Sequence, residues 1–186
     1  MIKNISKVFI ALLLVFSLYE NAVPVYALPT SVSLPLTRRE QEKSYWCWAA
    51  SAQMAGEYYG KNISQSTIVY QIRGTFNNVG ARGSDTLQAI NFALPQGKKA
   101  VETNVESKTF LQTKLSNSHV VPIVMQWNNG SGHVVVLSGY DSQGKLTITD
   151  PGKGCIQERS YPYNQLITNV TILSGTGKYV RTYVIN

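Results

Sequence analysis

The spacing of apolar residues changes near residue 119, and this change constrains the fold more than any other feature of the sequence. Before it, apolar residues such as Leu87, Ile90 and Leu94 recur at intervals of three and four, which is typical of amphipathic helices. After it, continuous or alternating apolar runs between turn residues are typical of strands. Helices followed by strands predict an α+β fold in which a helical layer packs on an antiparallel sheet. The expected helices cover 47–60, 64–74, 84–94 and 108–115, and the expected strands cover 119–127, 132–140, 145–151 and a pair within 169–185.

The ends of these elements carry their own signals. Ser84 and Ser107 are expected to cap the helices that follow them, because a serine hydroxyl can accept a hydrogen bond from a free amide of the first turn. Pro122 cannot donate to a strand ladder, which indicates an edge strand or the start of a strand. The glycine-bearing stretch 77–85 lacks the spacing of a phosphate-binding loop, and we interpret it as a plain turn.

Residues 1–27 are interpreted as a secretory signal peptide. Lys3 and Lys7 precede an apolar run over 8–19, which is shorter than the roughly 20 residues that span a bilayer. Val25 and Ala27 occupy the small-residue positions of a cleavage site. We therefore expect export and removal of 1–27, leaving 28–186 as one domain without an integral membrane span. The alternative is an N-terminal membrane anchor.

The charge of the chain excludes one class of partner and favours another. It carries 17 Lys and Arg and 10 Asp and Glu, a net charge of +7, and removal of Lys3, Lys7 and Glu20 leaves 15 and 9, or +6. No run of basic residues is longer than two, so the basic stripe typical of nucleic-acid-binding proteins is missing. A scattered excess of this size favours weak attraction to anionic surfaces, such as a bacterial wall or acidic substrates.

The chain has two cysteines, and Cys47 stands between two tryptophans at the head of a small-residue run. A disulfide with Cys155 is the plain structural role for it in an exported protein. Otherwise Cys155, in the loop "DPGKGCIQE", is expected to be an unrelated surface or half-buried thiol. A zinc site from both cysteines and both histidines has suitable ligand types, but the sequence contains no short-spaced ligand pair.

A catalytic thiol is a second possible role for Cys47. The start of a helix has unpaired amides and a dipole that favour negative charge, and the thiolate is the nucleophilic form of cysteine. Such a nucleophile needs a base, and the chain has only two histidines. His133 opens a strand directly after the loop "NNGSG", where it can face a cleft. His119 precedes another strand among short polar residues, and we interpret it as a loop histidine.

Two further residues complete a catalytic arrangement. Asp150 ends the strand that follows the His133 strand, so antiparallel pairing brings it back toward the histidine, where a carboxylate can fix the imidazole tautomer. The side-chain parity of this pairing stays open, and an ordinary strand-ending turn is the alternative for Asp150. The side-chain amide of Gln41 and the backbone amide of Cys47 can supply two hydrogen bonds to an oxyanion.

These residues carry a resemblance to a known family. Gln41, five residues before the pair Cys47 and Trp48, together with the later "GHVVVLSGY" and "DP", resembles the papain-like cysteine peptidases. The sequence is most similar to their compact bacterial branch, which includes the double-glycine leader peptidases and the secreted cysteine protease effector of plant pathogens. The similarity covers 35–185. It implies a papain-like fold, with the nucleophile at a helix start and an antiparallel sheet that carries His and Asp.

The resemblance also implies the roles of four residues: Cys47 as nucleophile, His133 as base, Asp150 as orienting residue and Gln41 as oxyanion donor. Papain has an asparagine in the orienting role, whereas the bacterial branch has aspartate. Only 13 residues lie between Ala27 and Gln41, so after the expected cleavage we do not expect the long inhibitory propeptide of papain-type enzymes. The leader peptidases belong to export transporters on the cytoplasmic side, so their double-glycine specificity is not transferred to this chain.

The function expected from the sequence is therefore a secreted cysteine endopeptidase, extracellular or wall-associated and of bacterial origin. We expect a monomer that acts on protein or peptide, with no cofactor, no metal and no nucleic acid, and an activator from a host or a wall stays open. One alternative is an amidase, deamidase or transglutaminase-like enzyme with the same catalytic residues, because a fold does not name its substrate. The other alternative is a non-catalytic secreted binding module.

Overall fold

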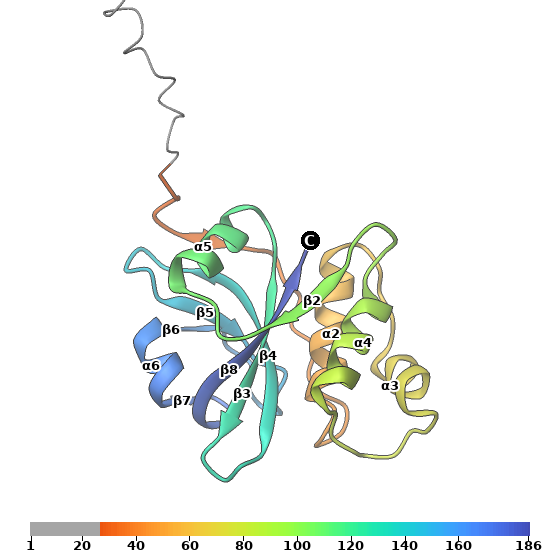
Figure 1. Ribbon diagram of the computed structural model, residues 1–186. Helices are drawn as coiled ribbons and strands as arrows, with labels where there is room; N and C mark the ends of the chain where they lie inside the picture. The colour runs from red at the N-terminus through yellow and green to blue at the C-terminus, as the bar shows by residue number, and fades with distance from the viewer. Residues whose placement is uncertain (1–26) are drawn as a thin grey trace, which may run out of the picture.

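The computed structural model describes residues 27–186 and confirms the α+β class (Figure 1). The expected signal peptide lies outside the described residues, apart from Ala27 itself, and its removal stays a prediction. Within 27–186, no helix combines the length and apolar character needed to cross a membrane.

Three helices form a layer on one face of the sheet. Each matches a predicted helix to within about two residues, the uncertainty with which helix ends are assigned. Helix α3 is capped by the Ser64 hydroxyl and ends at Gly74 in the left-handed conformation that glycine favours. The helices are α2 (Cys47–Tyr58), α3 (Gln65–Arg73) and α4 (Gly83–Ala93).

The sheet is antiparallel throughout, in the strand order β2-β8-β3-β4-β5-β6, and β1 and β7 pair at the side with β4 and β8. The strands are β1 (Val32–Ser33), β2 (Ala100–Thr103), β3 (Val121–Trp127), β4 (Gly132–Tyr140), β5 (Leu146–Thr149), β6 (Arg159–Tyr161), β7 (Val170–Ile172) and β8 (Gly175–Ile185). Pro122 is the second residue of β3, which fits the predicted strand start, although β3 is an inner strand.

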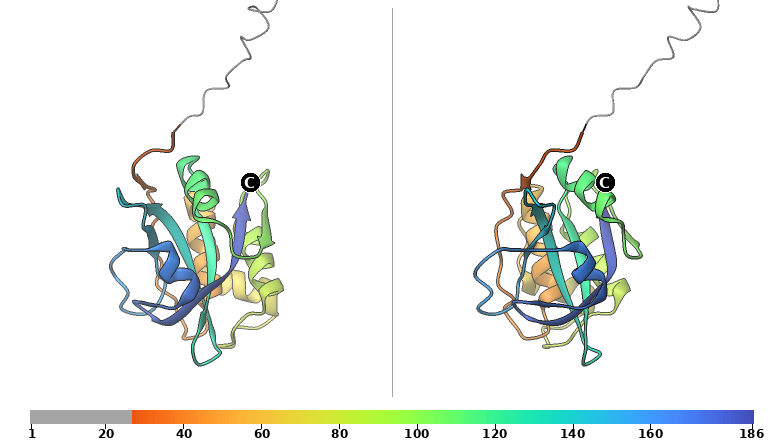
Figure 2. Two further views of the ribbon diagram at one scale, coloured as in Figure 1. Left: turned by 60° about the vertical axis from the view of Figure 1, so that its left-hand side comes forward. Right: turned by 90° about the vertical axis from the view of Figure 1, so that its left-hand side faces the viewer.

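Alternation along the strands gives the sheet two buried faces, and Figure 2 shows helices on either side of it. Val134 and Val136 of β4 pack with α2, α3 and α4 in one apolar core, whereas Val135 and Leu137 belong to a second core on the other face. Helices α5 (Lys108–Ser116) and α6 (Tyr163–Thr168) cover this second face. The helices therefore lie on both sides of the sheet, so α5 and α6 add a layer to the two that the sequence predicts.

The sequence predicts the long elements and misses several of the short ones. The four predicted helices are present, as are the predicted strands β3, β4, β5, β7 and β8, and Ser107 caps α5 as expected. Ser84 is not a cap, because α4 begins one residue earlier and Asp85 instead accepts a hydrogen bond from the backbone of Arg82. The unpredicted elements are β1, β2, β6 and α6, of two to six residues each, whose short stretches show no clear period.

Candidate active site

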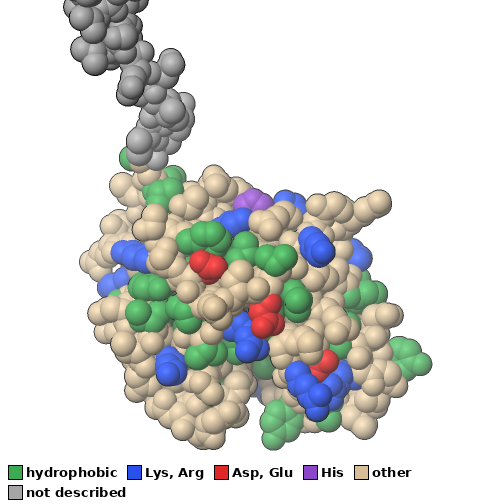
Figure 3. Space-filling view, in the orientation of Figure 1, with side chains coloured by type: hydrophobic (Ala, Val, Ile, Leu, Met, Phe, Trp, Pro, Cys, Tyr) green, Lys and Arg blue, Asp and Glu red, His purple; other side chains and the backbone are tan. Residues whose placement is uncertain are grey.

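A cleft of about 950 Å³ opens between the helical layer and the sheet. In Figure 3 it corresponds to the notch at the lower edge of the molecule, between the tip of the β3–β4 hairpin and the helical side. Its lining includes Gln41, Cys47 and His133. Asp150 is buried behind His133, with 1% of its surface exposed. The fold thus brings together the four residues that the sequence selected.

Cys47 is the first residue of α2, as predicted. No side chain caps this helix end, and its first turn contains no acidic residue that would compete for the free amides. Cys47 is 9% exposed, so the sulfur is largely shielded and still reaches the cleft. The neighbouring tryptophans Trp46 and Trp48 are 1% exposed and anchor the start of the helix in the core.

His133, the second residue of β4, forms the other half of the site. Its Nε2 lies 2.8 Å from Oδ1 of Asp150, and Nδ1 is the ring nitrogen left for Cys47. Burial alone lowers the pKa of His133, but hydrogen bonds and charge interactions with Asp150 and Cys47 outweigh it and raise this pKa to about 9. At neutral pH the arrangement therefore favours an imidazolium between a carboxylate and a sulfur.

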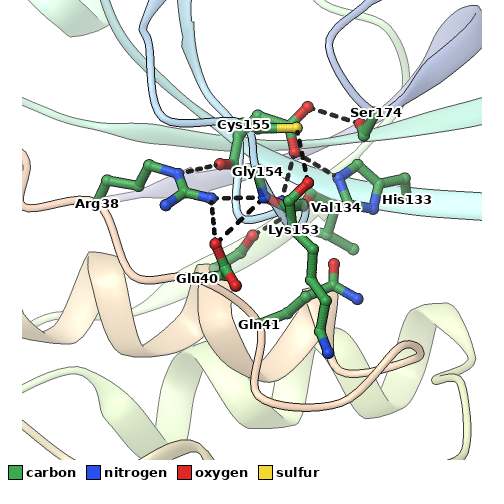
Figure 4. Close-up of polar contacts among 12 residues, drawn as sticks. Arg38, Glu40, Gln41, His133, Val134, Lys153, Gly154, Cys155 and Ser174 are labelled. Atoms are coloured by element: carbon green, nitrogen blue, oxygen red, sulfur yellow. Dashed lines mark hydrogen bonds and ion pairs between the residues drawn. The ribbon is translucent and has the colours of Figure 1, made fainter.

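Asp150 is held in its ionised form by several donors. Burial acts to raise its pKa, but hydrogen bonds from His133, Ser174 and the Gly152 amide outweigh burial and lower it. The Ser174 hydroxyl donates to Oδ2 at 2.6 Å and the Gly152 amide to Oδ1 at 2.8 Å (Figure 4). Both carboxylate oxygens are thus satisfied, which fixes the orientation of the group that orients His133.

A register shift between β4 and β5 decides the side on which Asp150 emerges. Gly139 pairs with Thr147 but Leu137 pairs with Ile148, so Ser138 is an extra residue in β4. Because of this residue, the continued pairing places Asp150 opposite Val135, on the same face as His133. Without it, Asp150 would stand opposite a residue of the other face. The shift settles the side-chain parity that the sequence leaves open.

The segment that carries Gln41 is tied to the loop after Asp150. Arg38 donates from Nε to the Asp150 carbonyl at 2.8 Å and from Nη2 to the Gly152 carbonyl at 2.5 Å. The backbone N–H of Gln41 donates to the Pro151 carbonyl at 2.8 Å. Figure 4 shows Arg38 reaching across to this loop. The position of the orienting carboxylate is thereby coupled to that of the expected oxyanion donor.

The side chain of Gln41 makes contacts that the sequence did not predict. Its Nε2 donates to the carbonyls of Lys43 at 3.0 Å and Ser44 at 2.6 Å. A primary amide nitrogen has two hydrogens, so a bond to an oxyanion requires that one of these contacts be shared or released. Gln41 lies at the predicted place, and its role as oxyanion donor stays a prediction.

Two residues next to Cys47, His133 and Asp150 were not assigned to the site from the sequence. The ring of Trp127 stacks on His133 with centroids 5.5 Å apart, and it shields the face of the imidazole. Cys155 is 4% exposed, so the expectation of an unrelated surface or half-buried thiol is wrong. Burial and the nearby Asp150 carboxylate raise the pKa of Cys155 to about 11, which keeps it a thiol.

Cys47 is part of neither a disulfide nor a metal cluster in the described part of the chain. Both cysteines are free, so no bond joins Cys47 to Cys155. Within 27–186, no group of three or more His, Cys, Asp or Glu residues could hold a metal ion. His119 lies away from the cleft, with Nδ1 3.4 Å from the Tyr59 hydroxyl, as expected for a loop histidine.

Ser174 and Arg38 are the contacts of the site that sequence analysis missed. Ser174 lies in the turn between β7 and β8, 24 residues from Asp150, and Arg38 is 112 residues away from it. Neither belongs to a motif of recognisable spacing. Trp127 could have been found, because it ends the strand that pairs with the His133 strand across a short hairpin.

Comparison with known proteins relates the chain to a family of peptidases. Residues 33–175 match the Peptidase_C39 like family. A structure described as a C39-like peptidase from Bacillus anthracis is 20% identical, covering 83% of this chain and 97% of its own, with a TM-score of 0.57. A double glycine motif protease from an AMS/PCAT transporter, solved in complex with its leader peptide, is 19% identical, with coverages of 83% and 93% and a TM-score of 0.55.

The likeness extends to a more distant enzyme. Procathepsin L 3 from the larval midgut of Tenebrio molitor is 12% identical, covering 84% of this chain and 71% of its own, with a TM-score of 0.55. At these identities the structural matches show the fold alone, and they agree with the papain-like arrangement expected from the sequence. Among curated protein sequences, none matches this chain.

Proposed function

The chain belongs to the Peptidase_C39 like family of cysteine peptidases, and from this premise we propose that it is a secreted endopeptidase with a Cys47–His133–Asp150 triad. The observation that carries the proposal is the contact of 2.8 Å between His133 and Asp150, at the wall of a cleft that Cys47 enters from a helix start. Its substrate is a protein or peptide that lies in this cleft.

The reaction proceeds through a thioester. The Cys47 thiolate attacks the carbonyl carbon of the scissile peptide bond, and the electron pair of the carbonyl moves to its oxygen. As the tetrahedral species collapses, the C–N bond breaks and His133 gives its proton to the leaving amine. His133, now neutral, takes a proton from water, and the hydroxide attacks the thioester. The acid product leaves, and the thiolate–imidazolium pair is restored.

The surrounding groups lower the barrier of these steps. The backbone amide of Cys47 has no partner within its own helix, because it is the first helical residue, and it can donate to the oxyanion. Gln41 supplies the second donor once Nε2 shares or releases one of its two carbonyl contacts. Asp150 stabilises the imidazolium and holds the tautomer that presents Nδ1 to the sulfur.

The decisive test is covalent trapping of the nucleophile. The protein without residues 1–27 is incubated at mildly acidic pH with a peptidyl epoxide, and the adduct is located by mass mapping. We expect modification of Cys47 alone, since Cys47 lines the cleft that admits the peptide probe, whereas Cys155 lies outside the lining and its pKa is raised to about 11. Cys155→Ser serves as the matched control and should label as the parent does, whereas Cys47→Ala should not label.

Turnover provides the second readout. Cys47→Ala should cleave no peptide in a library of unbiased sequence, and its circular dichroism should match that of the parent. Cleavage of peptides by Cys47→Ala, or adducts only on Cys155, would contradict the proposal. Turnover of wall-derived amides with no peptide cleavage would instead favour the amidase alternative.

Secretion is tested separately, by N-terminal sequencing of the exported protein, which should begin at Leu28.

A further inference from the structure

Outside the pair Cys47–His133, the charged side chains that line the cleft are positive. They are Lys153 and Arg181, and among the described residues no Asp or Glu belongs to the lining. Asp150 lies behind the wall, and its negative charge is compensated by His133. A cleft with two such cations beside a neutralised catalytic pair attracts anionic groups and disfavours cationic ones.

Strand pairing determines where Arg181 stands in the cleft. Val134, next to His133, pairs with Val124 of β3, which in turn pairs with Arg181 of β8. Residues that pair directly point to the same face of a sheet. The three side chains therefore form a row across the cleft floor, which starts beside the catalytic histidine and ends at the guanidinium.

A second register shift is responsible for this position. Met125 pairs with Tyr179 but Val124 pairs with Arg181, so Val180 is an extra residue in β8. Without the extra residue Val180 would stand opposite Val124, and Arg181 would point to the opposite face of the sheet. The irregularity therefore places a charged side chain where a regular ladder would place an apolar one.

The surroundings of Arg181 leave its terminal nitrogens near the cleft. The Glu102 carboxylate, on the outer strand β2, pairs with Nε through Oε1 at 3.1 Å, and its Oε2 lies 3.2 Å from a Cβ built at Gly83. Glu102 is therefore a partner of Arg181 at the edge of the cleft, although it does not belong to the lining. Nη1 lies against Gly83, where a built Cβ would come within 2.2 Å of it, so a glycine at this position makes room for the guanidinium. The Arg181 side chain is 42% exposed, and a substrate can reach it.

We propose that Arg181 is a specificity-determining residue that selects a carboxylate side chain, Asp or Glu, in the peptide substrate. This inference rests on the proposed peptidase function and names its substrate class. A guanidinium can bind a carboxylate through two parallel hydrogen bonds, which gives direction as well as charge. Lys153, exposed beside Gly152, adds a second positive charge to the same cleft.

Strand geometry limits the substrate position that Arg181 can read. Two strand spacings separate Val134 from Arg181, or about 10 Å. An extended peptide advances about 3.3 Å per residue, so the selected side chain lies within about three residues of the scissile bond. The preference should therefore be confined to one position on one side of that bond.

The experiment uses fluorogenic peptides that are identical except at one position, which holds Glu, Gln or Lys, and that position is moved through three residues on each side of the bond. At one position we expect kcat/KM for the Glu peptide to exceed that for the Gln peptide by about tenfold. The factor is modest because the guanidinium is partly exposed and already pairs with Glu102. Lys at that position should be the poorest substrate, and added salt should reduce the preference for Glu.

Two variants connect the preference to one side chain. Arg181→Gln should bring the Glu-to-Gln ratio close to one, mainly through a loss of kcat/KM for the Glu peptide, and Arg181→Lys should retain part of the ratio. Arg159→Gln is the matched control, because it removes an exposed arginine on β6, outside the cleft lining, and should leave the ratio unchanged. Circular dichroism of each variant verifies that it is folded.

The possible outcomes distinguish a failure of the role of Arg181 from a failure of the proposed peptidase function. Cleavage of neutral peptides with no preference for Glu at any position, or a preference that survives in Arg181→Gln, would overturn the role of Arg181 and leave the peptidase intact. An equal loss of the preference in Arg159→Gln would show that it follows net charge, and would likewise overturn it. If no peptide is cleaved and Cys47 is not labelled, the function itself fails.

Discussion

Cys47 and the pair His133–Asp150 reach the cleft by different routes. The helical layer delivers its residue through local structure, since Cys47 needs only the start of α2 and two buried tryptophans beside it. The sheet delivers its residues through pairing, because His133 and Asp150 are 17 residues apart and meet only if β4 and β5 adopt the shifted register. Changes in the sheet should therefore affect chemistry first, whereas changes in the helical layer other than at Cys47 itself should affect stability.

Among changes in the sheet, the largest effect is expected from His133→Ala. This change removes the group that pairs with the thiolate and protonates the leaving amine, so kcat/KM should fall by about 10³-fold or more. The measurement is hydrolysis of a good peptide substrate under pseudo-first-order conditions. His119→Ala is the control, because it removes the other histidine of the described chain and should retain parental kcat/KM. Comparable losses in both variants would contradict the assignment of the base.

Asp150→Asn tests the orienting role separately from the base. An amide keeps most of the shape but loses the negative charge, so the pKa of His133 should fall from about 9. Activity needs the imidazolium, which is lost as pH rises through this pKa, so parental activity should decline above about pH 9. In Asp150→Asn the decline should begin at lower pH, and kcat/KM at neutral pH should fall about a hundredfold. An unmoved alkaline limb would contradict the assigned role.

The same contrast explains what could be predicted from the sequence. The helices follow from apolar spacing over 8 to 14 residues, and for two of them from a terminal glycine, so their bounds were predicted to within about two residues and the place of Cys47 was predicted correctly. His133 and Asp150 could be selected by residue type and strand order. The face on which Asp150 emerges could not, because a single extra residue at Ser138 reverses it and no residue type marks that shift.

The contacts around the proposed triad could not be predicted from the sequence either, because they join segments that are distant in the chain. Ser174 and Arg38 act through hydrogen bonds to a loop far from them in the chain, and their own neighbours in sequence carry no pattern. Cys155 was misjudged because the loop "DPGKGC" looks polar, whereas the Asp150 turn folds over its thiol. Burial in a loop depends on what packs against it, and the local sequence does not contain this information.

Arg38→Gln should show whether the N-terminal segment positions the triad. Loss of its two hydrogen bonds to the Asp150 and Gly152 carbonyls should loosen the carboxylate, lower kcat about tenfold and shift the alkaline limb toward lower pH. Arg39→Gln is the matched control, because Arg39 pairs with Glu57 of α2 and makes no contact with that loop in the described chain. A loss of stability without a shift in the pH profile would show a merely structural role.

The smallest effect on activity is expected from Gly56→Ala, which acts within the helical layer. A Cβ at Gly56 would meet the backbone oxygens of Ala93 at 2.5 Å and Lys61 at 2.9 Å, so α2 and α4 would have to separate. Overpacking of this kind should lower the free energy of unfolding by about 1–3 kcal/mol, measured by urea denaturation. Because the clash is more than two turns from Cys47, kcat/KM of the folded fraction should stay within about twofold of the parent.

Gly80→Ala, where nothing lies within 4 Å of the added Cβ, serves as the stability control. A large loss of kcat/KM in the folded Gly56→Ala protein would mean that the helical layer also tunes the chemistry, and that the division between the two layers does not hold.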